Sequence, residues 1–140
     1  MRISVLTPSF NSADYIERSI KSVLSQTYKN WEHIIIDGGS TDDTVKVLKK
    51  YNHIKWVSEP DKGQSDAMNK AFEMCTGDFI VYLNSDDYFY PEAFFTLIKA
   101  FEVNTNTDII VGNLHVDKKG IKEPRTNVTI SWKDLSILKG

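Results

Sequence analysis

The chain has 140 residues, of which 41% are hydrophobic and 26% are charged, and its net charge at pH 7 is −2. This length and mixture suit a folded protein with a substantial core, and the slightly acidic balance gives no sign of a nucleic-acid-binding surface. No apolar run approaches the roughly 20 residues that cross a membrane.

Strand and helix patterns alternate along the chain. Short apolar runs predict strands at residues 3–7, 31–36, 54–58, 79–83 and 108–116. Apolar side chains at helical spacing predict a helix after each of the first four strands, and Pro91 begins the fourth helix. Residues 118–120 indicate a hairpin turn with a weak strand beyond it, and residues 132–138 a last helix capped by Ser131.

Two of the helix starts carry residues that favour capping. Asn11 and Ser12 precede the first helix, and Ser40 with Asp43 resembles a capping box for a second helix that runs to Lys50. We expect these side chains to bond to the first turns of those helices.

The alternation of strands and helices predicts the α/β class, with a mostly parallel central sheet flanked by helices on both faces. The continuous apolar run at residues 34–36 is typical of a strand buried on both sides. Ligands of such sheets bind beyond the carboxyl ends of the strands. Four polar segments occupy those positions, at residues 7–11, 37–40, 59–66 and 84–87, and we expect them to converge along one edge.

Two adjacent carboxylates, Asp86 and Asp87, follow the fourth strand, and the nearest basic residues in sequence are Lys70 and Lys99. Like charges at the end of a buried strand repel each other, and a hard divalent cation would relieve that repulsion. The alternative is an acidic first turn before the helix that Pro91 opens. The glycine patterns of dinucleotide-binding Rossmann sites and of P-loops are absent from the sequence.

Four motifs in order carry a resemblance to a known family. They are TPSFN at residues 7–11, IDGGSTDDT at 36–44, GQSDAMNK at 63–70 and SDD at 85–87. Together they resemble family-two glycosyltransferases with the Rossmann-like GT-A fold, over residues 1–116. The resemblance implies an inverting enzyme that takes a sugar from a nucleotide-diphosphate donor, in bacterial polysaccharide or cell-surface glycan synthesis.

The resemblance also implies roles for particular residues. Asp87 would hold Mn²⁺ or Mg²⁺, which stabilises the departing diphosphate. Asp86 would bind the ribose and Asp37 the N–H edge of the base. The other donor-binding positions would be Thr7, Pro8, Ser9, Asn11 and Asp66. Each role has a structural alternative: Asp37 as a turn residue, Asn11 as a helix cap, and Asp66 as a first-turn acid that offsets the helix dipole.

Inverting transfer needs a general base, which in this family lies well downstream of the acidic pair. Asp108, Asp117, Glu123 and Asp134 lack the family's context, so we expect the base beyond Gly140. Residues 117–140 would then begin the acceptor side, whose partner is a saccharide or lipid-linked saccharide. Two other functions stay open, a sugar-phosphate nucleotidyltransferase and a non-catalytic nucleotide-binding module.

The single cysteine, Cys75, cannot form an internal disulfide, and a strand follows the N-terminus at once. These features predict a cytoplasmic protein without a signal peptide. Peripheral association with the inner face of the membrane would come through the acceptor part.

Overall fold

The structure is a computed structural model that describes residues 1–104, 106–112, 114–118 and 121–125. The chain divides into two compact units, Met1–Phe95 and Thr96–Gly140. The proposed division into a donor-binding domain of residues 1–116 and a following region stays a prediction.

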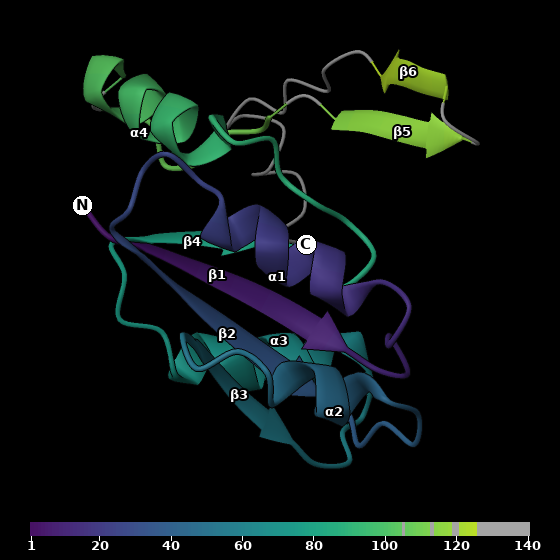
Figure 1. The fold of residues 1–140 in the computed structure, drawn as a ribbon. Coiled ribbons are helices and arrows are strands. Elements are labelled where there is room, and N and C mark those ends of the chain that lie inside the picture. Colours follow the sequence, from purple (N-terminus) through teal and green to yellow (C-terminus); the bar gives the residue numbers. More distant parts are fainter. Residues whose placement is uncertain (105, 113, 119–120, 126–140) are drawn as a thin grey trace, which may run out of the picture. The chain divides into compact units, whose positions relative to one another are not determined.

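The first unit is built on four parallel strands in the order β3-β2-β1-β4 (Figure 1). The strands are β1 (Ile3–Ser9), β2 (Trp31–Asp37), β3 (Ile54–Ser58) and β4 (Phe79–Tyr82). Three helices connect them, α1 (Ile16–Leu24), α2 (Thr44–Leu48) and α3 (Gln64–Glu73). All four strands therefore end at the same edge of the sheet.

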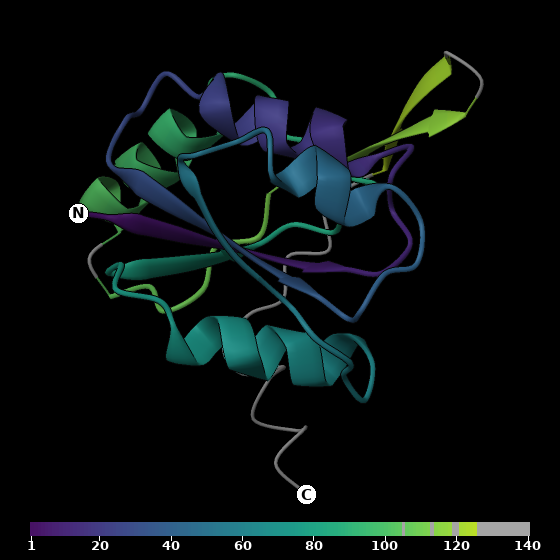
Figure 2. The same cartoon turned by 60° about the horizontal axis from the view of Figure 1, so that its bottom comes forward.

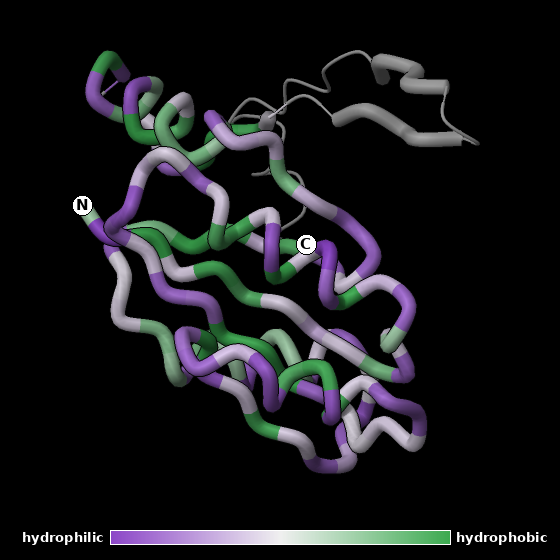
Figure 3. The backbone as a smooth tube through the Cα atoms, in the orientation of Figure 1, coloured by the Kyte–Doolittle hydropathy of each residue, from purple (hydrophilic) through white to green (hydrophobic). Residues whose placement is uncertain are grey.

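Helices cover both faces of this sheet, with α1 and α2 on one side and α3 on the other (Figure 2). Successive side chains of a strand point to opposite faces, so β2 supplies both layers. Ile35 packs with residues of α1 and α2, whereas Ile34 and Ile36 pack with Ala67 and Ala71 of α3. Figure 3 shows this apolar stretch in green. The predicted α/β class is confirmed. The apolar run at residues 34–36 belongs to a strand that is buried on both faces, as predicted.

The last elements are α4 (Ala93–Val103), β5 (Leu114–Lys118) and β6 (Ile121–Arg125). The strands β5 and β6 form an antiparallel pair, as the hairpin signal predicts. The strand predicted over residues 108–116 is confirmed only for residues 114–116, which belong to β5; residues 106–112 contain no strand, and among the described strands β5 pairs with β6 alone. Gly112 interrupts the apolar run, and the residues from Leu114 onward form the first strand of a hairpin. The predicted helix at 132–138 and its cap Ser131 lie outside the described residues.

Both capping predictions are also wrong. The helix α1 begins at Ile16, four residues beyond Ser12, and α2 begins at Thr44; neither has a side-chain cap. The polar side chains before these helices bond across loops instead, as described below. In the described part of the chain, no helix is long and apolar enough to span a membrane.

Candidate functional site

A cleft of about 750 Å³ lies at the carboxyl ends of the strands. The strand register aligns Ser9 with Asp37 and Asp37 with Ser58, so the segments that follow these residues start side by side. The cleft is lined from all four predicted segments and the start of α1, by Pro8, Ser9, Phe10, Asn11, Ser12, Tyr15, Gly38, Asp61, Gly63, Gln64, Ala67, Asn84, Ser85 and Asp86. The predicted convergence of these segments is confirmed.

Two of the lining loops are bonded to each other. The Asn11 N–H donates to Ser40 Oγ at 2.7 Å, and Asn11 Oδ1 accepts the Thr41 N–H at 2.9 Å. Next to this pair, the Ser12 N–H donates to Thr44 Oγ1 at 2.8 Å. Asn11 has a φ of 47°, in the left-handed region that asparagine tolerates better than most residues. These contacts fix the wall of the cleft that β1 and β2 supply.

Asp37 lies beneath that wall and is fully buried. Its Oδ2 accepts the Ser40 N–H at 2.9 Å and the Ser58 hydroxyl at 2.7 Å, and its Oδ1 accepts the Ser40 hydroxyl. A carboxylate offers about four acceptor positions, so these three bonds leave capacity for one more donor. Asp37 does not itself line the cleft. Its role toward a base stays a prediction.

The TPSFN segment contributes residues of two kinds. Pro8 and Ser9 line the cleft, and the buried Ser9 Oγ has no hydrogen-bond partner among the described residues. Thr7 is buried under the cleft, and its hydroxyl bonds to His33 Nε2 at 2.9 Å. Burial, with a smaller contribution from His53, lowers the pKa of His33 to about 3, so this imidazole is neutral and structural.

A close approach of two segments explains Gly38. A Cβ at this position would lie 2.8 Å from the Asp61 carboxylate, nearer than real Cβ contacts allow. Asp61 in turn accepts the Gly63 N–H at 2.8 Å, just before α3 begins. The glycine therefore lets the loop after β2 meet the loop that leads into α3.

Both carboxylates of the acidic pair are exposed, but only Asp86 is among the residues that line the cleft, and Asp87 is not. The Asp86 carbonyl accepts a bond from Arg18 Nη2 at 2.8 Å. The Arg18 guanidinium also stacks on Tyr88, with Cζ 4.6 Å from the ring centre. Asp87 Oδ2 accepts the Asn84 side-chain N–H at 3.2 Å. Exposed carboxylate oxygens are the hard donors that Mg²⁺ or Mn²⁺ prefers.

A metal ion here would need ligands from outside the protein. In the part of the chain that the structure describes, no group of three or more His, Cys, Asp or Glu side chains could hold an ion. Mg²⁺ in phosphate-transferring and related sites is typically held by one or two carboxylates plus substrate phosphates. The acidic pair therefore fits a cation that arrives with a phosphate ligand.

Asp66 lies in the first turn of α3, outside the cleft lining. It accepts the Lys62 N–H at 3.2 Å and pairs with Lys70 Nζ at 3.4 Å. The bond from the Lys62 backbone, followed by that from Lys70, lowers the pKa of Asp66. This environment matches the structural alternative, and a role toward a donor stays a prediction.

Several lining residues had no role in the sequence-based prediction, and four of them have side chains that offer a ring or an amide to a ligand. Phe10 and Tyr15 expose 62% and 52% of their surface, and Gln64 and Asn84 bond to each other across the cleft. Phe10, Gln64 and Asn84 stand in the strand-end segments, so their position could have suggested them. Tyr15 lies outside these segments, one residue before α1, so nothing in its sequence position suggested that it lines the cleft.

Comparisons with known proteins agree with this geometry. The family model described as glycosyl transferase family 2 matches residues 4–137. Among curated relatives, chondroitin synthase of Escherichia coli is 33% identical over 123 residues, which is 84% of this chain. That match spans only 18% of the relative's own length.

Solved glycosyltransferases have the same fold. A crystal structure of residues 1–349 of S. aureus TarS with UDP-GlcNAc superposes with a TM-score of 0.69 at 26% identity, covering 75% of this chain and 32% of the TarS 1–349 chain. Glucosyl-3-phosphoglycerate synthase from Mycobacterium tuberculosis, solved with Mn²⁺, UDP and glucosyl-3-phosphoglycerate, gives a TM-score of 0.59 at 26% identity and covers 71% and 39% of the two chains. The GT-A type of α/β fold is thereby confirmed.

Proposed function

This chain belongs to glycosyl transferase family 2, and from that membership we propose that its cleft binds the nucleoside diphosphate part of a sugar donor together with Mn²⁺ or Mg²⁺. The observation that carries the proposal is the convergence of four polar segments on one cleft whose lining includes the exposed Asp86, next in sequence to the exposed Asp87. UDP-GlcNAc in TarS, and Mn²⁺ with UDP in the mycobacterial synthase, support the choice of ligand class.

The proposed roles follow from what each side chain offers. Asp87 would hold the ion and Asp86 would accept hydrogen bonds from ribose hydroxyls. The buried, unpaired Ser9 Oγ would bond to the nucleoside, and the exposed Phe10 ring offers a face for stacking on a base. The ion, when bound, would stabilise the charge that develops on the diphosphate.

We further propose transfer with inversion, which rests on the family resemblance. The bond between the sugar's anomeric carbon and the diphosphate breaks as a bond to the acceptor oxygen forms on the opposite face, and a general base takes the acceptor's proton. A saccharide or lipid-linked acceptor, the cytoplasmic location and membrane association stay predictions. The similarity to chondroitin synthase of Escherichia coli supports a saccharide as the acceptor.

A thermal-shift panel tests the proposal. We expect UDP or GDP to raise the melting temperature more in Mn²⁺ or Mg²⁺ than in EDTA, and adenine nucleotides serve for comparison. A ligand that binds only the folded state at a hundred times its Kd adds about 2.7 kcal/mol of stability. Equal melting curves with and without every nucleotide and ion would refute the proposal.

Asp87→Asn should weaken metal-dependent nucleotide binding tenfold or more, about 1.4 kcal/mol, because the amide cannot supply an anionic ligand. Calorimetric titration of the nucleotide in Mn²⁺ measures the loss, and titration in EDTA gives the metal-independent baseline. Asp43→Asn is the matched control, since Asp43 is also exposed but pairs only with Lys46 among the described residues. Unchanged binding by the Asp87 variant would remove Asp87 from the metal site.

Asp37→Ala should lower nucleotide affinity by about 1–3 kcal/mol, because a donor on the base loses its acceptor in a buried setting. Ser58→Ala removes one bond to Asp37 and keeps the carboxylate, so it controls for local loosening. A purely structural Asp37 would lower the melting temperature of both variants and leave both nucleotide affinities at the wild-type value. Calorimetry and melting curves of the two variants separate these results.

A further inference from the structure

Two amide side chains connect the walls of the cleft. Gln64 is the first residue of α3, and Asn84 lies two residues beyond β4. Gln64 Nε2 donates to Asn84 Oδ1 at 2.9 Å, and Asn84 Nδ2 donates to Asp87 Oδ2 at 3.2 Å. A chain of hydrogen bonds thus runs from α3 to one carboxylate of the acidic pair.

The chemistry of these groups fixes the direction of the chain. An ionised carboxylate only accepts hydrogen bonds, so the amide of Asn84 must turn its NH₂ group toward Asp87. The Asn84 carbonyl oxygen then faces Gln64, whose own NH₂ group must meet it. One orientation of each amide satisfies both bonds, whereas reversing Gln64 breaks one of them and reversing Asn84 breaks both.

We propose that Gln64 and Asn84 are positioning residues, which hold the Asp87 carboxylate in the orientation that receives the metal ion. This inference rests on the proposed function, because it needs Asp87 to be a ligand. Residues that hydrogen-bond to a metal ligand restrict its rotation and commonly affect metal affinity by 10–100-fold when changed. Gln64 reaches Asp87 only through Asn84, so its effect must depend on Asn84.

The competing explanation is a surface bond that stabilises the fold slightly and does nothing for the metal. The two explanations differ in one quantity, the ratio of nucleotide affinity in Mn²⁺ to nucleotide affinity in EDTA. A positioning role lowers this ratio, whereas a structural role changes both affinities together and leaves the ratio constant.

The experiment is a double-mutant cycle with UDP and GDP as probes, titrated by calorimetry in Mn²⁺ and in EDTA. We expect Asn84→Ala to lower the affinity ratio about tenfold, the lower end of the range for such residues because this pair is exposed. Gln64→Ala should lower it about threefold in the wild type, and less than about twofold in the Asn84→Ala background. Gln64→Met, which keeps a similar length but has no N–H donor and no charge, should match Gln64→Ala.

Asn52→Ala is the control, because Asn52 is an exposed amide in the turn before β3, at the opposite edge of the sheet from the cleft. Melting curves without ligand establish that each variant is folded. An unchanged affinity ratio in Asn84→Ala, or additive effects in the double variant, would overturn the inference and leave the proposed function intact. A wild-type protein without any Mn²⁺-dependent binding would overturn both.

Discussion

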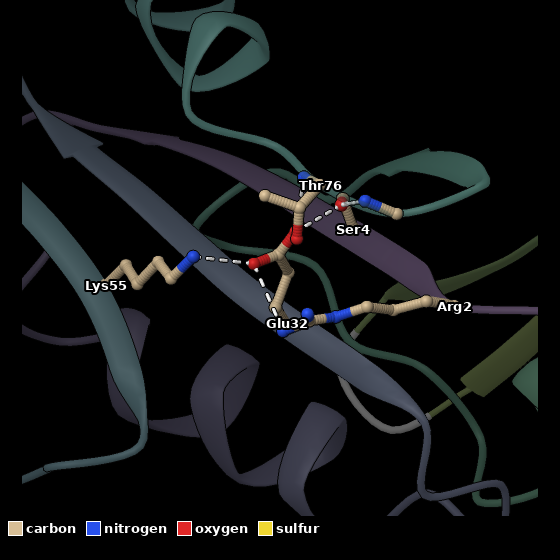
Figure 4. Close-up of polar contacts among 6 residues, drawn as sticks. Arg2, Ser4, Glu32, Lys55 and Thr76 are labelled. Carbon is tan, nitrogen blue, oxygen red and sulfur yellow. Dashed lines mark hydrogen bonds and ion pairs between the residues drawn. The ribbon is translucent and has the colours of Figure 1, made fainter.

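Glu32→Gln should lower the free energy of unfolding at pH 7 by about 3 kcal/mol. Glu32 is only 4% exposed, at the amino end of β2, and it is the centre of the polar network in Figure 4. Glu32 Oε1 accepts the Ser4 hydroxyl at 2.7 Å and the Thr76 N–H at 2.7 Å. Its Oε2 faces Lys55 Nζ at 2.8 Å and Arg2 Nη2 at 3.3 Å.

The pKa of Glu32 gives the size of this effect. Burial alone would raise the pKa, but the bonds from Lys55, Ser4 and Thr76 outweigh it and lower the pKa from 4.5 to about 2. Each tenfold change in proton affinity is worth about 1.4 kcal/mol, so the shift corresponds to about 3 kcal/mol. The amide of glutamine can still accept two of the bonds but loses both ion pairs.

The same shift predicts a pH dependence. The folded state binds a proton at Glu32 less readily than the unfolded state does, so its contribution is fully present above the unfolded pKa of 4.5. It is lost as the pH falls from about 4.5 toward 2. Urea unfolding of wild type and Glu32→Gln should therefore differ most at neutral pH and converge in acid. Glu73→Gln, at an exposed position in α3, controls for the general loss of one carboxylate. A difference that stays constant from pH 7 to pH 2.5 would contradict this account.

Gln26→Leu should lower the free energy of unfolding by about 1–3 kcal/mol, because it removes the acceptor of the buried Phe94 N–H. Gln26 is fully buried just beyond α1. Its Nε2 donates to the Tyr90 carbonyl at 2.7 Å, and its Oε1 accepts the Phe94 N–H at 3.0 Å. Leucine fills a similar volume but can satisfy neither group.

Urea unfolding measures the size of this destabilisation, and hydrogen exchange shows which backbone amide is affected. The Phe94 amide should exchange faster in Gln26→Leu, because its acceptor is gone. Thr27→Ala is the matched control, since Thr27 reaches the same segment through exposed bonds to Pro91 and Glu92 and should cost no more than about 0.5 kcal/mol. Equal costs for the two variants would show that the buried amide does not hold the segment that follows the acidic pair.

The sheet and the position of the cleft could be predicted because they follow from strong, repeated patterns. Ile34, Ile35 and Ile36 have no polar alternation, so only a strand covered on both faces accommodates them. The polar segments after the strands then had to share an edge, since parallel strands end together. The acidic pair was identified for the same reason.

The polar contacts of the loops could not be predicted, because short polar side chains bond equally well to nearby and distant backbone. Asn11 and Ser40 have the chemistry of helix caps, yet they bond to each other's loops across 29 residues of sequence. The Glu32 network likewise joins residues up to 44 positions apart. Distances of this kind depend on the register of neighbouring strands, which sequence spacing does not encode. The apolar run likewise suggested a strand from residue 108, but Gly112 interrupts the run and the strand begins only at Leu114, within the hairpin.

The opposite placement of the Glu32 network and the cleft has a consequence for how such a protein can change. The network links the amino ends of β1 and β2 by hydrogen bonds, whereas the loops that line the cleft follow the carboxyl ends of these strands. Substitutions in the loops therefore leave the Glu32 network intact, and under the proposed function a new donor preference would come from exchanging residues 9–13, 38–43 or 59–63 without rebuilding the sheet. An engineer who grafts those loops from a relative with another nucleotide preference should begin by keeping Arg2, Ser4, Glu32 and Lys55 unchanged.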